Sequence, residues 1–576
     1  MTAQPAPDRT SDPSRDARSV LSSVFGLSGF RGAQEKIVRH VTAGGNCLVL
    51  MPTGGGKSLC YQLPATVTRG ATDGLTVVVS PLLALINNQV KLLLRRRIPT
   101  LAITSEMSEA DRRFACSELF KPGLQVRLLY VTPEFVCNAR LAENMLRHLH
   151  ERGRLARFVI DEAHCVDQWG HDFRPDYVRL SKLRDEYPGV PLMALTATAR
   201  LDTVADIQRR LGMRDALVLR QSFNRPNLTY RIEPKRRGPA MLEHMAAYIR
   251  NTHADACGIV YCLSRRDCEN VANDLTTRFG IRARHFHAGM SNGDKAAIQD
   301  GWERGEYRVI VATIAFGMGI DKPDVRFVIH HSMPKSLEGY YQETGRAGRD
   351  GLRAECVLYW AMEDSRRLES MIRDSPDASP AQQRVQFTSL AQVKAFCLEL
   401  NECRRTNILK YFGEHFDPAA CRGACDNCQR AHTAAVDMTT TARDFVAMVR
   451  LLGSGHYTRT LAQAVFRGSM RRDVTERSLH LNMYHGRGAA LSDPELKRLV
   501  DYLLTEDILA EYPVRASRQQ FPNHYVKLGP AADDLLRGAR SVVVVVPGAP
   551  RPPHTPPAAP TPPAAPTPPA APTPPA

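Results

Sequence analysis

A glycine-rich turn that ends in lysine and serine is the first feature of the sequence able to do chemistry. It reads Met-Pro-Thr-Gly-Gly-Gly-Lys-Ser over residues 51–58 and directly follows the apolar run 47–50. Three glycines let backbone N–H groups curl around phosphate oxygens, because no Cβ stands in the way. Lys57 would reach the β- and γ-phosphates of a nucleotide, and Ser58 would ligate Mg²⁺. The alternative is a glycine-rich surface turn, but the strand pattern before it and the helical pattern after it favour a nucleotide site. The residues expected to hold the nucleotide here are Thr53, Gly54, Gly55, Gly56, Lys57 and Ser58.

A pair of acids follows a second apolar run, about 100 residues further along the chain. The run 158–160 ends in Asp161-Glu162-Ala163-His164. Carboxylates at the carboxyl end of a parallel strand face the same crevice as the phosphate loop. Asp161 suits Mg²⁺, and Glu162 could polarise an attacking water. Four letters alone could be coincidence, but their place after a strand and a phosphate loop makes the pattern specific.

Four closely spaced cysteines form the third chemical feature. Cys403, Cys421, Cys425 and Cys428 follow the spacing C-x₁₇-C-x₃-C-x₂-C. Thiolates in a reducing compartment suit tetrahedral Zn²⁺, and a site closed by four of them has a structural role. The alternative is a set of free thiols. Cys397, six residues before the first ligand, has apolar neighbours and is expected to pack in a core instead.

Length and composition exclude several classes of protein. The chain has 576 residues, 43% of them apolar, and a formal charge of +16. It therefore needs several domains and is not disordered throughout. No apolar run reaches the ~18 residues of a membrane helix, and residues 1–18 lack the apolar region of a signal peptide. Fourteen cysteines in so long a chain do not indicate a disulfide scaffold. The positive charge lies in the body of the chain and favours a polyanionic partner over a general solubility bias.

The residues of these three motifs must be positioned by regular secondary structure. Two successive parts of the chain each show a pattern of alternating strands and helices. Short apolar runs separated by helical stretches predict a parallel α/β sheet. The first set of runs is 47–50, 76–79, 128–131, 158–160 and 192–195, and the second is 258–262, 309–312, 325–329 and 355–358. We therefore expect an α/β protein with two parallel-sheet lobes in tandem. A helical, cysteine-containing stretch follows to about 429, then a mixed segment to 540. From Thr555 the unit TPPAAP repeats, which predicts a polyproline II rod or coil.

Together these motifs carry a resemblance to a known family. The phosphate loop and the DEAH sequence resemble superfamily 2 helicases, and the continuation 165–177 (CVDQWGHDFRPDY) resembles the RecQ family of DNA helicases. Further matches are Phe25-Gly26, Phe30-Arg31-x-x-Gln34, Ser80-Pro81-Leu82, Thr132-Pro133-Glu134, 195–199 (LTATA) and 222–227 (SFNRPN). The resemblance covers roughly residues 20–530. Within the family, the order of parts, the cysteine spacing and 325–333 (VRFVIHHSM) are most like the short eukaryotic RecQ paralogue.

The resemblance assigns further residues to the nucleotide and to DNA. It implies that Gln34 reads the adenine and that Arg31 belongs to the same nucleotide-binding set. Residues 169–174 look like the aromatic-rich loop that senses single-stranded DNA. Stacking faces on Trp169 and Phe173 and the charge of Arg174 agree with that role. In the last folded segment, the run 493–504 reads as a helix capped by Ser492, and 509–514 with 524–528 as a hairpin, as in the family's winged helix. Phe521 is either a strand-separating pin at the hairpin tip or a core residue.

Two motifs of the second lobe complete the nucleotide site that the resemblance implies. Residues 311–321 resemble motif V, and 341–350 (YQETGRAGRD) resemble motif VI. A nucleotide crevice between two lobes needs a cation from the second lobe to neutralise charge on the transferred phosphoryl group. Gln342, Arg346 and Arg349 are the expected catalytic residues of motif VI. Arg349 is favoured as the arginine finger and Arg346 as a γ-phosphate contact, but the sequence does not separate them.

The expected organisation follows from these motifs. The domains are a disordered N-terminus (1–19), a RecA-like ATP-binding lobe (20–222), a RecA-like C-terminal lobe (223–361), a zinc-binding module (362–429), a winged-helix DNA-binding domain (430–540) and a disordered proline-rich tail (541–576). The resemblance implies an ATP-dependent 3′→5′ DNA helicase that uses ATP, Mg²⁺ and Zn²⁺ and acts on forked or junction DNA. The alternatives are a DNA-stimulated ATPase that mainly anneals or remodels strands, and a DNA-binding scaffold. No membrane partner is expected, a PxxP match in the tail could dock a protein, and the nucleus is the expected location (cytoplasm or nucleoid in a bacterial source).

Overall fold

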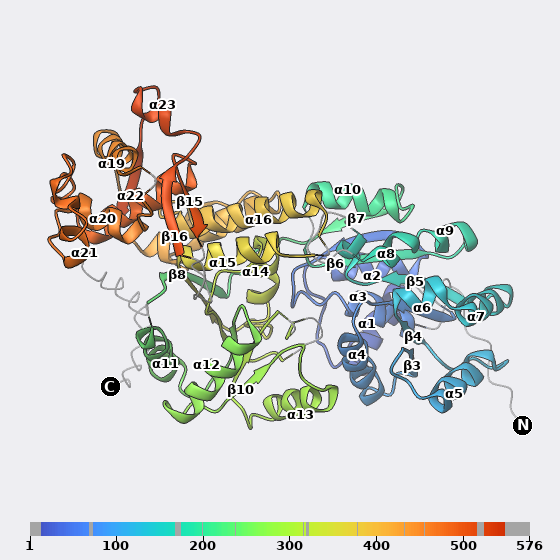
Figure 1. Ribbon diagram of the computed structural model, residues 1–576. Coiled ribbons are helices and arrows are strands. Elements are labelled where there is room, and N and C mark those ends of the chain that lie inside the picture. Colours follow the sequence, from blue (N-terminus) through green and yellow to red (C-terminus); the bar gives the residue numbers. More distant parts are fainter. Residues whose placement is uncertain are drawn as a thin grey trace, which may run out of the picture. The chain divides into compact units, whose positions relative to one another are not determined.

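The computed structural model of the chain divides into two compact units, one up to Gln429 and one from Arg430 (Figure 1). The structure describes residues 13–67, 73–166, 174–198, 200–236, 238–314, 316–317, 322–376, 378–430, 433–453, 455–514 and 523–547. Each unit is described by itself. The first contains two α/β lobes and the cysteine-containing module, and the second contains the last folded segment.

Lobe 1 is built on a seven-stranded sheet in the order β3-β4-β2-β5-β6-β1-β7. All of its strand pairs are parallel. The strands are β1 (Cys47–Leu50), β2 (Leu75–Val79), β3 (Thr100–Ile103), β4 (Leu128–Val131), β5 (Leu155–Ile160), β6 (Leu192–Thr196) and β7 (Leu217–Arg220). The central strands β1 and β5 therefore end at the same edge of the sheet, and each runs into one of the two chemical motifs of this lobe.

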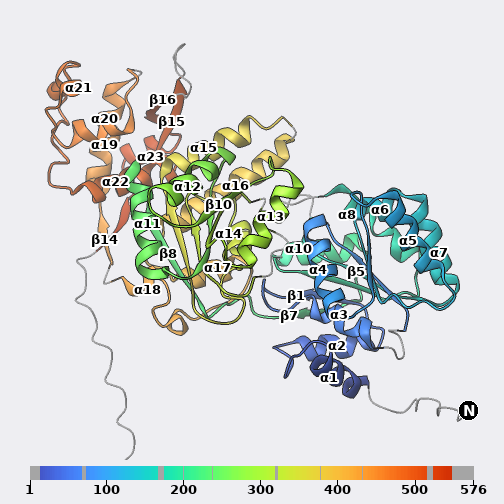
Figure 2. The ribbon, with the colours of Figure 1, turned by 90° about the horizontal axis from the view of Figure 1, so that it is seen from below.

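Helices cover both faces of this sheet, which explains why its strands read as continuous apolar runs. In β1, Leu48 and Leu50 pack into one core cluster while Cys47 and Val49 pack into the other, because successive side chains point to opposite faces. One face is covered by α1 (Pro13–Ser23), α2 (Gln34–Thr42), α3 (Leu59–Thr66) and α4 (Leu83–Arg95). The other is covered by α5 (Glu109–Phe120), α6 (Pro133–Asn138), α7 (Arg140–Glu151), α8 (Pro175–Arg179), α9 (Lys182–Glu186) and α10 (Leu201–Arg210). Figure 2 shows α1 and α2 below the sheet and α6 and α8 above it.

Lobe 2 repeats this plan with a six-stranded sheet in the order β10-β11-β9-β12-β13-β8. All of its pairs are again parallel. Its strands are β8 (Leu228–Pro234), β9 (Cys257–Tyr261), β10 (Ala283–Phe286), β11 (Val309–Ala312), β12 (Val325–His330) and β13 (Ala354–Trp360). Its helices are α11 (Pro239–His253), α12 (Arg265–Thr277), α13 (Asn292–Glu303) and α14 (Leu337–Thr344). The prediction of two parallel-sheet lobes in tandem is confirmed.

The module that follows lobe 2 is helical, as expected. It consists of α15 (Met362–Arg373), α16 (Pro380–Leu398), α17 (Arg404–Tyr411), a 3₁₀ turn (Pro418–Cys421) and α18 (Asp426–Gln429). Ser379 begins α16 with a capping box, because its side chain accepts from the amide of Gln382 while Gln382 reaches back to the amide of Ser379. Phe396 and Cys397, near the end of α16, are buried in the core that this module shares with both lobes.

The second unit has its own hydrophobic core and confirms the helix and hairpin expected for it. Ser492 caps α22 (Asp493–Thr505) and accepts from the amide of Glu495. Strands β15 (Leu509–Val514) and β16 (Asn523–Leu528) pair antiparallel. The remaining elements are α19 (Thr439–Leu452), α20 (Arg459–Phe466), α21 (Arg472–Thr475), α23 (Ala532–Leu536), β14 (Thr433–Asp437) and β17 (Val543–Pro547). No helix in the described part of the chain is long and apolar enough to cross a membrane.

Two predicted boundaries need correction. Helix α1 begins at Pro13, inside the range 1–19 that was expected to be disordered, and its residues Ala17 and Leu21 are buried against lobe 1. Strand β17 lies inside the range 541–576 that was assigned to the tail, yet it pairs antiparallel with β14. The second unit therefore extends at least to Pro547. Strands β3, β7, β8 and β10 were not predicted.

Candidate active site and zinc centre

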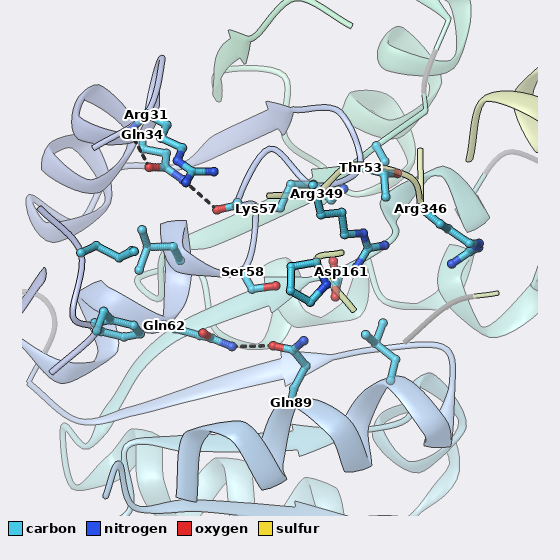
Figure 3. A pocket seen from close by; sticks show the side chains of 18 of the residues that line it. Arg31, Gln34, Thr53, Lys57, Ser58, Gln62, Gln89, Asp161, Arg346 and Arg349 are labelled. Atoms are coloured by element: carbon cyan, nitrogen blue, oxygen red, sulfur yellow. Dashed lines mark hydrogen bonds between the residues drawn. The ribbon is translucent and has the colours of Figure 1, made fainter. Parts of the chain in front are cut away.

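A pocket of about 430 Å³ is lined by residues of both lobes (Figure 3). Lobe 1 contributes the phosphate loop and the two acids that follow β5, and lobe 2 contributes the turn after α14. The predicted residues on its wall are Arg31, Gln34, Thr53, Gly54, Gly56, Lys57, Ser58, Asp161, Glu162, Gln342, Arg346 and Arg349. The structure thus brings together residues that are separated by more than 300 positions in the sequence.

The backbone of the phosphate loop requires glycine at two positions. Gly54 has a φ of +78° and Gly56 a φ of +85°, in the region that other residues rarely adopt. A Cβ on Gly56 would also lie 2.2 Å from Nε2 of Gln34. Gln34 donates from Nε2 to the carbonyls of Gly55 and Gly56 at 3.3 and 3.2 Å, and its Oε1 accepts from the amide of Arg31 at 2.8 Å. Gln34 therefore stabilises the conformation of the phosphate loop, in addition to the expected contact with the adenine of the nucleotide.

Lys57 is the cation that the phosphate loop contributes to this pocket. Its Nζ lies 3.5 Å from the carbonyl of Met51, and burial lowers the pKa of its ammonium, while the nearby carboxylates of Glu162 and Asp161 oppose that shift. A desolvated cation next to a loop of backbone amides is suited to bind phosphate oxygens. Ser58 lines the same pocket at the start of α3.

The two acids lie at the end of β5, where the chain turns sharply. Burial raises the pKa of Asp161 to about 7, with the charge of Glu162 adding to the shift and Lys57 opposing it. Glu162 has a φ of +49°, a strained conformation for a non-glycine residue. Within the described residues its Oε2 makes no hydrogen bond and lies 3.4 Å from Nδ1 of His164. The buried carboxylate of Asp161 and the half-buried carboxylate of Glu162 form a donor set that fits Mg²⁺.

Lobe 2 delivers three polar side chains to the site. Gln342 donates from Nε2 to Oγ1 of Thr198 in lobe 1 at 2.9 Å. Arg346, 6% exposed, donates from Nη1 to the backbone carbonyl of Gly317. Arg349 lies against the phosphate loop, since its Cγ is 3.1 Å from the place that a Cβ on Gly54 would occupy. The two arginines therefore differ: one is bound to its own lobe, and the other contacts the loop of lobe 1.

Several residues of the site were missed in the sequence: Gln62, Gln89 and Arg96 line the pocket, and Arg225 contacts the phosphate loop. Arg225 lies in the matched segment 222–227, which was given no role, and its guanidinium donates to the carbonyl of Thr53 in the phosphate loop at 2.6 Å. It also donates to the carbonyl of Gly348, which directly precedes Arg349, at 2.9 Å. Its place between the two predicted lobes was the only hint that the sequence offered. Its partners could not be predicted, because they are backbone carbonyls, which every residue type has.

The four predicted cysteines come together in the helical module. Their sulfur atoms all lie within 4.8 Å of one another. A hydrogen bond from Cys425, whose Sγ lies 3.9 Å from that of Cys403, lowers the pKa of the Cys403 thiol to about 4, and burial opposes the shift. Four cysteine sulfurs at this spacing fit tetrahedral Zn²⁺. Cys397 is buried in the core and does not belong to the cluster, as predicted.

The residues predicted to contact DNA are described only in part. Arg174 donates from Nη1 to the carbonyl of Pro81 at 2.8 Å, so it ties the start of α8 to the segment before α4. Trp169, Phe173 and Phe521 lie outside the described residues. Near the hairpin, Tyr525 packs on His456, with ring centroids 4.9 Å apart.

Sequence models of four protein families match consecutive parts of the chain. They are a DEAD/DEAH box helicase model over residues 31–207, a helicase conserved C-terminal domain over 240–351, a RecQ zinc-binding model over 362–429 and an RQC domain over 433–552. The zinc-binding match contains all four clustered cysteines, and the first match contains the phosphate loop and both acids. The cofactors of the chain are therefore ATP with Mg²⁺ at the pocket and Zn²⁺ at the cysteine cluster.

Curated relatives extend these matches over nearly the whole chain. The ATP-dependent DNA helicase hus2/rqh1 of Schizosaccharomyces pombe is 43% identical, over 92% of this chain and 40% of its own length. The ATP-dependent DNA helicase Q-like 2 of Arabidopsis thaliana is 39% identical, over 91% of this chain and 71% of its own length. A solved structure titled "DUF1998 helicase MrfA bound to DNA and AMPPNP" covers 73% of this chain and 60% of its own, with 19% identity and a TM-score of 0.51, a similarity of fold.

The chain spans about two-fifths of the length of the first curated relatives it matches. An identity of 43% to a relative so much longer does not single out the short eukaryotic paralogue that the sequence motifs favoured. The similarity to the Arabidopsis protein covers most of both chains and all four matched domains have the order expected for one family. The chain belongs to the RecQ family of helicases.

Proposed function

We propose that this chain is an ATP-dependent DNA helicase that translocates 3′→5′ on single-stranded DNA and unwinds forked or junction duplexes in repair, recombination or replication. The observation that carries the proposal is the composite pocket, in which Lys57 and Asp161 of lobe 1 face Arg349 of lobe 2. A site completed by two lobes makes their closure depend on the bound nucleotide, which is the requirement for a motor. The name of the Schizosaccharomyces pombe relative, an ATP-dependent DNA helicase, agrees with this activity.

Five side chains of the pocket have a role in hydrolysis under this proposal. Lys57 and the loop amides bind the β- and γ-phosphates, and Ser58 and Asp161 hold Mg²⁺, which supplies neutralisation of phosphate charge. Glu162 orients the attacking water and accepts its proton. Arg349 places its guanidinium on the transferred phosphoryl group, where charge develops in the transition state.

A chain of polar contacts would connect the acid to lobe 2. Nδ1 of His164 lies 3.4 Å from Glu162 and 2.9 Å from Oγ1 of Thr196. Thr196 donates to the carbonyl of Thr198 at 3.1 Å, and the hydroxyl of Thr198 accepts from Gln342 at 2.9 Å. Movement of lobe 2 would therefore reach the group that orients the water. This connection supports a coupling between lobe closure and hydrolysis.

DNA is the partner that the charge of the chain supports. The formal charge of the chain is +16, and DNA is a polyanion. Contacts of Lys and Arg with phosphates release counterions, so binding should weaken steeply as salt is raised. We further propose a nuclear location. The proline-rich repeat that starts at Thr555 would dock a protein partner, and deletion of this repeat should leave unwinding unchanged.

The rival proposals are a DNA-stimulated ATPase that mainly anneals or remodels strands, and a DNA-binding scaffold. The buried pair of Lys57 and Asp161 argues against a scaffold, because a pure binder has no use for it. Strand displacement should be measured on duplexes with a 3′ tail and with a 5′ tail. A helicase of the proposed polarity displaces the strand only from the 3′-tailed duplex. ATP hydrolysis without displacement from either duplex would favour the annealing ATPase, and no hydrolysis would favour the scaffold.

A further inference from the structure

The linker between the two lobes, residues 222–228, is hydrogen-bonded to the zinc-binding module. Arg405 donates from Nη1 to Oδ1 of Asn224 at 2.8 Å and to the carbonyl of Arg225 at 2.7 Å. From Nη2 it donates to the carbonyl of Pro226 at 3.1 Å and to that of Leu228. One buried guanidinium therefore binds three backbone carbonyls of the linker. Arg405 is 3% exposed, so water does not compete for these acceptors.

A second group of the same module holds the start of the linker. The carboxylate of Glu414 accepts from the amide of Phe223 at 2.8 Å and from the hydroxyl of Ser222. The ring of Phe412 packs on Phe223 with centroids 5.1 Å apart. The linker is thus bound on both sides of Arg225 by residues that follow the first zinc ligand.

The side chain of Arg225 points from this linker into the active site. It donates to the carbonyl of Thr53 in the phosphate loop at 2.6 Å. Its other hydrogen bonds go to the turn of lobe 2 that precedes Arg349: to the carbonyl of Gly345 at 3.2 Å and to those of Ala347 and Gly348 at 2.9 Å each. The planar guanidinium matches this arrangement, because its donors lie in a fixed fork.

Arg405 lies in the first turn of a helix that begins next to a zinc ligand. Helix α17 begins at Arg404, directly after the ligand Cys403. Arg404 makes two hydrogen bonds to the carboxylate of Asp426, at 2.9 and 3.0 Å, and is 1% exposed. Asp426 lies between the ligands Cys425 and Cys428. Zinc bound to both segments would therefore fix the first turn of α17, and with it Arg405.

We propose that Arg405 and Arg225 form a relay of positioning residues through which the zinc-binding module sets the placement of the arginine finger against the phosphate loop. The relay runs from Cys403 through the side chain of Arg405 to the backbone of Arg225, and from the side chain of Arg225 to the backbone that carries Arg349. This inference rests on the proposed function only in taking the pocket as the site of hydrolysis. Misplacing a catalytic group by about 1 Å can cost roughly 10²-fold in rate.

The test uses Arg225→Lys, Arg405→Lys and the double variant of the full chain. Lysine keeps the charge but loses the fork of donors, so each variant should lower kcat of ATP hydrolysis about 10- to 100-fold. Affinity for a fluorescent Mg²⁺–ATP analogue should change less than about threefold, since Lys57 and the loop are intact, and the zinc content should be unchanged. The double variant should be no slower than Arg225→Lys alone, because both changes interrupt one path.

A control and a second readout separate the relay from a general loss of structure. Lys410→Ala removes an exposed cation, 75% exposed and 3.7 Å from Glu402, from the same helix and should leave kcat and zinc content unchanged. Hydrogen exchange of the amides of 345–351 should speed up about tenfold in both relay variants. This readout needs no catalysis, so it remains decisive if the wild type hydrolyses no ATP and the proposed function fails. The relay would be overturned if the exchange rates of these amides did not change. It would also be overturned if the losses of kcat multiplied in the double variant, or if the nucleotide affinity fell as much as kcat.

Discussion

The arginine that completes the ATP site can be identified by truncating each candidate of motif VI. In Arg349→Ala, the side chain that contacts the phosphate loop beside Gly54 is removed, while the bond of Arg346 to Gly317 remains. An arginine finger contributes about 10³–10⁵ in rate in comparable systems. At about 1.4 kcal/mol per factor of ten, this corresponds to roughly 4–7 kcal/mol of transition-state stabilisation. We expect kcat of Arg349→Ala to fall by at least about 10³-fold.

Arg346→Ala is the matched comparison, because it removes the same charge from the same turn. Arg346 is almost fully buried and satisfies the carbonyl of Gly317. Its loss leaves that acceptor unpaired and should lower the free energy of unfolding by about 1–3 kcal/mol. The thermal midpoint of Arg346→Ala should therefore fall.

The assay measures DNA-stimulated ATP hydrolysis under single-turnover conditions, together with the affinity for a fluorescent ATP analogue. Because a finger acts mainly in the transition state, Arg349→Ala should bind the analogue within a few-fold of the wild type. A kcat of Arg349→Ala within tenfold of the wild type would refute the assignment. If Arg346→Ala then lost at least 10³-fold without losing stability, the finger would be Arg346.

Two further predictions concern the zinc centre and a buried acid. Cys425→Ser should lower the zinc content well below about one per chain, as measured by elemental analysis, and should lower the thermal midpoint, because metal binding is coupled to folding; full zinc occupancy would contradict it. The imidazole of His253, whose Nε2 lies 3.6 Å from Oε2 of Glu355, lowers the pKa of that carboxyl to about 2, and the hydroxyl of Tyr248, which donates to the same oxygen, adds to the shift. Because the folded pKa lies below the ordinary value of 4.5, the charged carboxylate stabilises the fold above pH 4.5, and this contribution is lost as the pH falls toward 2. Glu355→Gln should therefore lower the thermal midpoint at pH 7 by an amount that shrinks below pH 4.5, whereas a difference that stays constant with pH would contradict the shift.

The residues that the sequence could predict are those held by local backbone patterns. The phosphate loop and the acids after β5 each lie at the end of a buried strand, so their positions follow from the order of strands in a parallel sheet. The cysteines were equally predictable, since their spacing and chemistry suffice. The structure adds that Arg349 contacts the phosphate loop while Arg346 binds Gly317, a difference that neighbouring arginines of one motif do not reveal.

Other features depend on contacts without a sequence signature. Arg225 and Arg405 act on backbone carbonyls, which every residue type offers, so no partner could be named in advance. Helix α1 was assigned to a disordered end because the composition around it is polar and charged. Strand β17 stands next to the proline-rich repeat, whose composition concealed it. In both cases tertiary contacts stabilise the element: Leu21 of α1 packs against lobe 1, and β17 pairs with β14.

Unwinding of a 3′-tailed fork by the wild type and by Lys57→Ala, side by side, tests the central claim most directly. Lys57 is the buried cation of the phosphate loop, so its loss should abolish ATP hydrolysis while the fork is still bound. The account predicts strand separation by the wild type with ATP and none by Lys57→Ala at equal binding of the fork. Equal unwinding by both proteins, or none by a wild type that binds the fork and hydrolyses ATP, would contradict it.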